Sequence, residues 1–250
     1  MHKSENRMKF LNTYVDNVTM DEAVYESEKL INNGKYNYIV TPNVDHIVKL
    51  EEDKEFKEIY NNADLILTDG MPLIWVSKIS RNPIKEKVSG SDFFPKLCGV
   101  AARKGYRIFL LGAAEGVAQQ AKANLEEKYN GINIVGTYSP KFGFEYDKDE
   151  IEKILNLVKN SAPHILAVGL GAPKQEKFIY KYLNELQVPL SLGIGATIDF
   201  EAGNIKRAPK WMQKSGLEWF YRFIKEPKRM FKRYFVDDVK FIKIVRKCTK

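Results

Sequence analysis

The chain has 250 residues and 44% of them are hydrophobic, which is enough to bury the core of one α/β domain or of one domain with an appendage. Its only cysteines, Cys98 and Cys248, stand outside any metal-ligand spacing, which argues against a disulfide scaffold or a zinc site and fits a reducing cytosol. No apolar run reaches the roughly 18 residues that a membrane span needs, so any membrane contact is expected at the protein surface.

The formal net charge of +8 is concentrated at one end of the chain. From Lys206 to Lys250 there are 15 Lys and Arg against 4 Asp and Glu, whereas the residues before Lys206 carry 25 against 28. A basic excess confined to one segment favours a phosphate-rich partner, either anionic lipid or nucleic acid.

In chain order we expect a flexible leader over residues 1–10, an α/β body over 11–204 and a C-terminal appendage over 205–250. Within the body, apolar runs of strand length alternate with longer amphipathic segments, which favours a parallel sheet flanked by helices. The predicted strands are Tyr38–Thr41, Leu65–Thr68, Arg107–Leu111, Ile132–Thr137, Ile165–Gly169 and Leu190–Gly193. The predicted helices are Val44–Tyr60, Met71–Lys78, Ser91–Lys104, Gly116–Tyr129, Asp149–Asn160 and Pro173–Leu186.

Four of the predicted strands end in unusual residues. Ligands bind beyond the carboxyl ends of the strands in open α/β sheets, so we expect these four ends to converge on one rim. They lead into Asn43, into Asp69-Gly70, into the loop 169–176 and into the loop 194–199. Two of these features also have a structural interpretation, Asn43 as a helix cap and Asp69-Gly70 as an ordinary turn.

Glycine-containing loops are the strongest candidates for ligand contacts. Residues 169–176 combine two glycines with Pro173 at a helix start, which leaves backbone N–H groups facing a possible phosphate. Residues 109–116 repeat the order strand, glycine loop and helix, but they lack the GxGxxG pattern of a dinucleotide site. In the loop after Gly193, small residues let the backbone approach a ligand.

The triplet Asp147-Lys148-Asp149 matches a DxD pattern that holds a metal in some enzymes. It directly precedes the helical run 151–159, where carboxylates favour a helix N-terminus, so we interpret it as a helix start and expect no metal there. His46 and His164 have no partner at ligand spacing, and we interpret both as structural or rim residues.

The segment after Ala208 alternates aromatic and cationic residues. Within it, Phe231, Phe235, Ile242 and Val245 are predicted to share one helical face, with Lys and Arg around it. A basic amphipathic helix with aromatic residues is typical of a segment that lies in a membrane interface. The alternative is that this apolar face packs on the α/β body.

Seven ordered motifs between about Leu11 and Tyr234 resemble the WecG/TagA/CpsF family of bacterial glycosyltransferases, and within it the TagA type. The motifs are TPNVD at 41–45, TDG at 68–70, SGSDFF at 89–94, FLLG at 109–112, GLGAPKQE at 169–176, GIGATIDFEAG at 193–203 and RAPKWMQKSGLEWFYRFIKEPKRMFKRY at 207–234.

This resemblance implies a Rossmann-like body with a C-terminal appendage that docks at the membrane and completes the active site. It implies β-1,4 transfer of N-acetylmannosamine from UDP-N-acetylmannosamine to N-acetylglucosamine on undecaprenyl diphosphate, in wall teichoic acid linkage-unit synthesis. The transfer would invert the anomeric centre and need no metal or other cofactor. The protein would be cytoplasmic, peripheral on the anionic inner face of the plasma membrane, and a homodimer in exchange with a monomer, with no nucleic-acid partner.

Site residues follow from the resemblance by motif position. Asp69 matches the proposed catalytic base, and the other matches are the pocket residues Thr41, Asn43 and Gln175 and the appendage arginines Arg222 and Arg229. A third cationic position is Lys232 here, which keeps the charge but loses the guanidinium fork, and the neighbouring Arg233 is an alternative for this lipid-diphosphate contact. Expected contacts with the UDP-sugar are Gly112, Gly169, Gly171, Gln175, Gly195 and Asp199.

The expected chemistry is base catalysis by Asp69, with the departing diphosphate stabilised by backbone N–H groups and by arginines. Because those arginines lie in the appendage, we expect its docking to couple membrane engagement to activity. Asp199 either contacts the nucleotide or braces Arg207.

Three other functions are compatible with parts of the sequence. Related enzymes use N-acetylmannosaminuronic acid, glucose or galactose as donor sugar in exopolysaccharide or capsule synthesis, and no single residue determines which. A nucleic-acid-binding protein would explain the basic tail, but it leaves the glycine loops unexplained. A nicotinamide-dependent oxidoreductase is disfavoured by the absent GxGxxG pattern.

Overall fold

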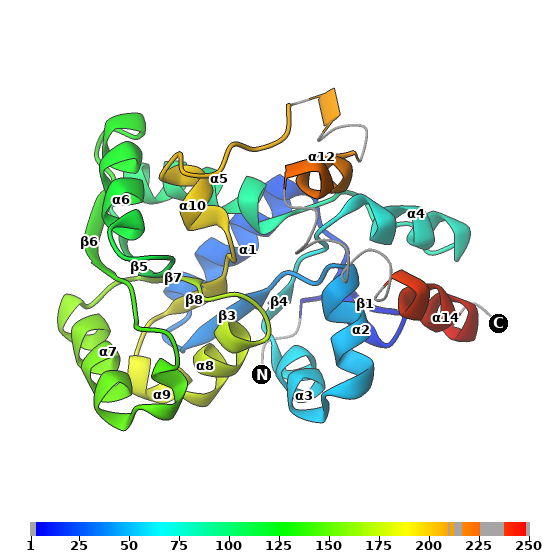
Figure 1. The fold of residues 1–250 in the computed structure, drawn as a ribbon, viewed down its shortest axis with the longest axis horizontal. Helices are drawn as coiled ribbons and strands as arrows, with labels where there is room; N and C mark the ends of the chain where they lie inside the picture. The colour runs from blue at the N-terminus through cyan, green and yellow to red at the C-terminus, as the bar shows by residue number, and fades with distance from the viewer. Residues whose placement is uncertain (1–3, 210, 213–216, 226–237, 249–250) are drawn as a thin grey trace.

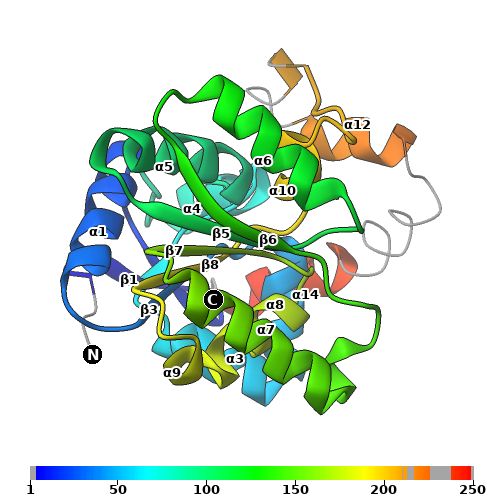
Figure 2. The same ribbon diagram turned by 90° about the vertical axis from the view of Figure 1, so that its left-hand side faces the viewer.

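A six-stranded parallel sheet crosses the centre of the molecule, in the order β4-β3-β8-β7-β5-β6 (Figures 1 and 2). The computed structural model describes residues 4–209, 211–212, 217–225 and 238–248. The strands are β3 (Asn37–Val40), β4 (Leu65–Ile66), β5 (Arg107–Gly112), β6 (Asn133–Tyr138), β7 (Ile165–Gly169) and β8 (Leu190–Gly193). Every predicted strand is present, and the α/β fold class is confirmed.

Helices cover both faces of this sheet, as Figure 2 shows. One face carries α1 (Met20–Asn32), α5 (Gly90–Lys104), α6 (Val117–Lys128) and α10 (Thr197–Glu201). The opposite face carries α2 (Val44–Glu52), α3 (Lys54–Asn62), α4 (Met71–Ile79), α7 (Lys148–Ser161), α8 (Lys174–Lys181), α9 (Leu183–Leu186) and α14 (Asp238–Cys248). Side chains alternate along each strand, so Ile39 joins the first core while Tyr38 and Val40 join the second.

Two predicted helices are each divided in the structure. Residues 44–60 form α2 and α3 because Asp53 ends the first helix and caps the second, where its carboxylate accepts from the Phe56 amide at 3.0 Å. Residues 173–186 form α8 and α9, which meet at Tyr182. A short 3-10 helix, η1 (Phe144–Tyr146), precedes α7.

The N-terminal part of the body is more ordered than predicted. β1 (Arg7–Phe10) and β2 (Thr13–Asp16) form an antiparallel hairpin, so the predicted flexible leader over residues 1–10 is too long. The Arg7 guanidinium holds the buried Asp16 carboxylate at 2.8 Å, and the same carboxylate accepts from the Ile66 amide at 2.7 Å. This ion pair joins the hairpin to the edge strand β4. Helix α1 was also not predicted, although Thr19 and Glu22 form a capping box at its start.

The last described helix, α14, packs on the body beside α2 (Figure 1). Phe241 and Ile244 are buried in the core, and Val245 packs against it. Of the residues expected on the membrane-facing side, Val245 therefore faces the body, Ile242 is exposed, and Phe231 and Phe235 lie outside the described residues. At α14 the structure thus follows the packing alternative, with Lys240 and Lys247 paired to Glu52 and Glu51 of α2.

Candidate active site

The carboxyl ends of the adjacent strands β4, β3, β8 and β7 meet at one edge of the sheet, as expected from the sequence. The connections that leave them are held together by backbone hydrogen bonds. The Asp69 amide donates to the Pro42 carbonyl at 2.8 Å, and the Ile194 amide donates to the Val168 carbonyl at 2.8 Å. We call the residues at these strand ends, 41–43, 68–70, 169–175 and 193–199, the rim.

The β4 side of the rim places Asp69 between the edge strand and α4. Its side chain is partly buried, and Gly70 after it has a φ of +104°, a conformation that favours glycine. The next connection returns beside it, because the Val88 amide donates to the Thr68 carbonyl at 2.9 Å. Asp69 is therefore held on a short, doubly anchored segment.

Thr41 and Asn43 lie on the adjacent β3 connection. The Thr41 side chain is buried, and the start of α5 packs over it, because a Cβ on Gly90 would lie 3.7 Å from the Thr41 hydroxyl. Asn43 caps α2, where its side-chain oxygen accepts from the His46 amide at 3.2 Å. The structural interpretation of Asn43 is thus present in the structure, and its carboxamide is partly buried at the same rim.

Gln175 ends the β7 side of the rim, and Glu176 follows it at the start of α8. The Gln175 side-chain oxygen accepts from the Gly195 amide at 3.1 Å, and its nitrogen donates to Glu176 Oε1 at 2.8 Å. Both side chains are buried, and a Cβ on Gly193 would lie only 2.6 Å from the Gln175 nitrogen. The carboxamide therefore joins the β7–α8 and β8–α10 connections in one fixed orientation.

Glu176 is a buried acid that the sequence analysis did not identify. Burial raises its pKa to about 7, against the hydrogen bond from Gln175, which favours the carboxylate. Among the described residues no hydrogen-bond partner faces its second oxygen. A glutamate in the first turn of a helix is usually an exposed dipole partner, so the sequence contains no clear indication of this burial.

The glycines predicted to contact the UDP-sugar divide into two groups. A Cβ on Gly112 would lie 2.4 Å from the Gly169 carbonyl oxygen, and one on Gly169 would lie 2.8 Å from the Gly195 carbonyl oxygen. These two glycines permit close packing of backbone against backbone. Gly171 and Gly195 instead have open space in the Cβ direction, at φ values of +77° and +52°. The Cβ directions of Gly171 and Gly195 therefore face open space at the rim.

A polar layer lies beneath the rim in α2 and α3. The imidazole of His46 is buried and contacts the Tyr60 hydroxyl at 2.6 Å, which confirms a structural role for this histidine. Burial raises the pKa of Tyr60, and the charges of Glu176, Asp45 and Asp69 raise it further. Several carboxyl groups are thus close enough to this hydroxyl to influence it electrostatically.

A cationic side chain from the segment after α10 pairs with the start of α5. Arg207 Nη1 lies 2.9 Å from the Asp92 carboxylate and donates to the Ser91 carbonyl at 3.2 Å. Burial raises the pKa of Asp92, but the hydrogen bond from Ser89 and the charges of Lys87 and Arg207 lower it below its usual range overall. Asp199 lies nearby in α10, where its backbone carbonyl accepts from the Asn204 amide at 3.1 Å.

The DxD triplet forms the start of α7. The Asp147 carboxylate accepts from the amides of Asp149 and Glu150 at 3.1 and 3.2 Å, which confirms the interpretation as a helix cap. In the described part of the chain, no group of three or more His, Cys, Asp or Glu side chains is arranged to hold a metal ion.

The appendage residues are only partly described. The backbone of Arg222 lies in α12 (Glu218–Lys225), and its side chain is outside the description. Arg229, Lys232 and Arg233 lie outside the described residues. No helix in the described ranges combines the length and the apolar composition that a membrane crossing requires.

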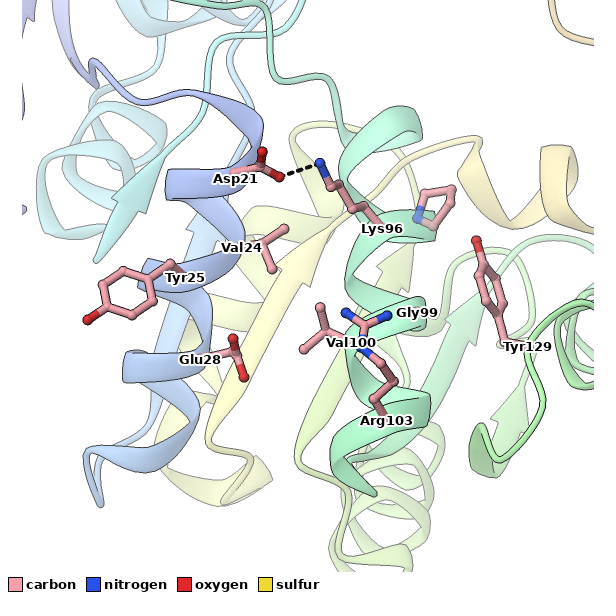
Figure 3. Close-up of a pocket in the computed structure, with 10 residues that line it drawn as sticks. Asp21, Val24, Tyr25, Glu28, Lys96, Gly99, Val100, Arg103 and Tyr129 are labelled. Atoms are coloured by element: carbon pink, nitrogen blue, oxygen red, sulfur yellow. Dashed lines mark hydrogen bonds and ion pairs between the residues drawn. The ribbon is translucent and has the colours of Figure 1, made fainter.

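A separate pocket of about 420 Å³ lies away from the rim, between α1 and α5 (Figure 3). Its lining includes Asp21, Glu28, Lys96, Arg103 and Tyr129, and Lys96 is paired with Asp21 across it. Because its charged groups are of both signs, it does not resemble a site for an anionic nucleotide.

Comparison with known proteins identifies the family of the chain. Over 178 residues the chain is 35% identical to an N-acetylglucosaminyldiphosphoundecaprenol N-acetyl-beta-D-mannosaminyltransferase of Bacillus subtilis (strain 168), covering 71% of this chain and 67% of that protein. It is 30% identical over 216 residues to a protein of the same name from Bacillus spizizenii, covering 86% of this chain and 82% of the relative. The model of the glycosyl transferase WecG/TagA/CpsF family matches residues 8–250, and the chain belongs to this family of glycosyltransferases.

Proposed function

We propose that this enzyme transfers N-acetylmannosamine from UDP-N-acetylmannosamine to N-acetylglucosamine on undecaprenyl diphosphate, forming the β-1,4 bond of the wall teichoic acid linkage unit. The names of both relatives support this donor and acceptor. The observation that carries the proposal is the position of Asp69, at a strand end on the same rim as the open loops at Gly171 and Gly195. The alternative is the same rim chemistry with another donor sugar.

Asp69 is the proposed general base. The acceptor hydroxyl loses its proton to the Asp69 carboxylate as its oxygen attacks the anomeric carbon from the face opposite the departing UDP, which inverts the configuration. The short segment between β4 and α4 supports this role because it limits the movement of the carboxylate. Thr41 and Asn43, on the adjacent strand end, are proposed to orient the sugars.

The leaving diphosphate is proposed to be stabilised without a metal ion. Backbone N–H groups near Gly171 and Gly195 supply part of the stabilisation, and Arg222 and Arg229 supply positive charge. Gln175 is proposed to act indirectly. Its buried carboxamide fixes the Gly195 backbone of the rim and does not reach into open space. Lys232 or Arg233 is proposed to contact the lipid diphosphate.

The appendage is proposed to bind the anionic inner face of the plasma membrane and to bring its arginines to the rim. In α12, Phe220 and Ile224 are 43% and 60% exposed and stand one helical turn apart, which suits an interfacial helix. A homodimer in exchange with a monomer is proposed to shelter this apolar surface away from the membrane, and light scattering with and without detergent tests this exchange.

The first test measures UDP release from UDP-N-acetylmannosamine with a short-chain lipid diphosphate N-acetylglucosamine acceptor, in EDTA. Asp69→Asn is expected to lower kcat by about a hundredfold or more, because the base is lost while the shape is kept. Asp149→Asn, in the DxD triplet, is the matched control and should keep full activity. Full activity of Asp69→Asn would assign the base to another residue, and dependence on a divalent ion would contradict the metal-free mechanism.

A second test addresses the appendage arginines. Truncation after residue 204 would also remove the packing of α14 on α2, so single substitutions separate activity from stability better. Arg222→Met and Arg229→Met are each expected to lower kcat at least tenfold through lost charge at the diphosphate. Arg246→Met, at an exposed position of α14, is the control. Equal activity in all three variants would exclude the two arginines from the mechanism.

If the wild-type enzyme releases no UDP, UDP release is measured with UDP-glucose, UDP-galactose and UDP-N-acetylmannosaminuronic acid. Release from one of these would identify a different donor sugar, and release from none would mean that the proposed reaction is wrong.

A further inference from the structure

Helix α4 has an apolar face that the protein core does not cover. Leu73, Ile74 and Val76 on its inner side are buried in the core. On its outer side, Trp75 is 45% exposed and Ile79, one helical turn further on, is 75% exposed. An exposed aromatic and an exposed aliphatic side chain one turn apart form a continuous apolar surface, which a soluble helix usually avoids.

The charged residues of α4 and of the turn after it have one sign. Lys78 and Arg81 are exposed beside Trp75 and Ile79, and no acidic residue occurs between Asp69 and Glu86. Tryptophan beside lysine and arginine is the combination found at membrane interfaces, where the ring lies at headgroup depth and the cations bind anionic lipid. The cationic surroundings thus favour an anionic bilayer as the partner.

The position of α4 relative to the rim also favours a bilayer as the partner. The helix begins two residues after Asp69, and its nine residues extend about 13 Å from that start. In Figure 1, α4 and α14 lie at the right-hand end of the molecule, and α12 lies closer to the centre of the view. An acceptor anchored in a bilayer must present its sugar at headgroup level, within reach of the base.

We propose that the outer face of α4 and the turn after it, formed by Trp75, Lys78, Ile79 and Arg81, is a membrane-binding surface of the α/β body, separate from the appendage. Trp75 and Ile79 enter the interface, and Lys78 and Arg81 bind anionic headgroups. This orients Asp69 toward the membrane surface. The choice of a bilayer rests on the proposed lipid-linked acceptor, and a second copy of this chain is the competing partner for the same face.

The direct test is flotation of the full-length protein with vesicles of phosphatidylcholine containing about one third phosphatidylglycerol. Trp75→Glu combined with Ile79→Glu is expected to weaken binding at least tenfold. Tyr25→Glu combined with Leu157→Glu places the same two charges on exposed apolar positions of α1 and α7 and should leave binding unchanged. Unchanged binding of the α4 variant would overturn the proposal.

A second measurement does not depend on an acidic substitution. With Trp211 and Trp219 replaced by Phe, Trp75 is the only tryptophan of the chain, and its emission should shift to shorter wavelength on anionic vesicles and be quenched by brominated lipid. Lys78→Glu combined with Arg81→Glu should abolish the shift. An emission spectrum that vesicles do not change would overturn the proposal even if the acidic variant failed to fold.

Two controls separate this surface from the alternatives. Sedimentation velocity without lipid measures the oligomeric state of the α4 variant. If the variant changed the oligomeric state but not vesicle binding, the partner would be a second copy of the chain, and the membrane assignment would be overturned. With a short-chain soluble acceptor, the Trp75→Glu, Ile79→Glu variant should transfer sugar at the wild-type rate. With a vesicle-embedded acceptor, its transfer rate should fall at least tenfold. Vesicle binding tests α4 even if the wild type transfers no sugar, so failure of the proposed function remains distinguishable.

Discussion

The two sides of the rim are built in different ways. On the β7 side, buried Gln175 and Glu176 hydrogen bond to each other and to the neighbouring loop, and glycines at 112, 169 and 193 allow that packing. On the β4 side, a single short segment carries Asp69 and continues into a helix whose outer face is exposed. The packed side has little freedom to move, whereas the open side is accessible to a large partner. This difference is the basis for proposing that the packed side would fix the donor and the open side would receive the acceptor.

The largest expected effect tests the packed side through Gly112. Replacement by alanine would place a Cβ 2.4 Å from the Gly169 carbonyl oxygen at a φ of +121°, so we expect Gly112→Ala to lower the free energy of unfolding by about 3 kcal/mol or more. Urea denaturation measures this loss. Gly116→Ala, where φ is +81° and nothing lies within 4 Å, should cost only about 1 kcal/mol. Equal losses would mean that the backbones of β5 and β7 are not tightly packed where Gly112 and Gly169 pair.

A second prediction concerns Glu176 and pH. Its pKa is about 7 in the folded protein, above the 4.5 of an ordinary glutamate, so the folded state binds this proton more tightly. The contribution to stability is complete below pH 4.5 and is lost as pH rises through 7, by up to about 3 kcal/mol. Glu176→Gln keeps a neutral group at every pH and should remove this dependence.

The measurement is the free energy of unfolding of wild type and Glu176→Gln at pH 5 and pH 8. The variant should gain about 2.5 kcal/mol relative to wild type between the two values. Glu126→Gln, at an exposed position of α6, should show no such gain. A pH-independent difference for Glu176→Gln would mean that the Glu176 carboxyl is not buried in the folded protein.

The smallest expected effect is on the open side. Ile79 is exposed, so Ile79→Ser should change the free energy of unfolding by less than about 0.5 kcal/mol. Leu73→Ala, on the buried face of the same helix, should cost about 2–5 kcal/mol. If Ile79→Ser proved as costly as Leu73→Ala in thermal or urea unfolding, the outer face of α4 would be part of the core in solution.

The sheet could be predicted from the sequence because its strands are short, apolar runs bounded by glycine and polar residues. Boundaries were less accurate where a helix cap or a contact with a distant segment decides them. The predicted helix 44–60 breaks at Asp53, whose carboxylate caps α3 and also pairs with Lys177 at 2.7 Å. The hairpin at residues 7–16 depends on Arg7 reaching the backbone of Ala63 at 2.8 Å. Periodicity within a short window does not contain such contacts.

Likewise, only part of the candidate site could be predicted from the sequence. The sequence by itself determined which polar residues and glycines follow the strands, because parallel strands must end at a common edge. Tertiary structure alone decided that Glu176 is buried, that Gln175 is fixed within the wall, and that Gly112 and Gly169 pack against backbone instead of facing open space. Burial and orientation depend on neighbours brought together only by folding, and the local sequence GLGAPKQE is the same whether its glutamate faces solvent or the core.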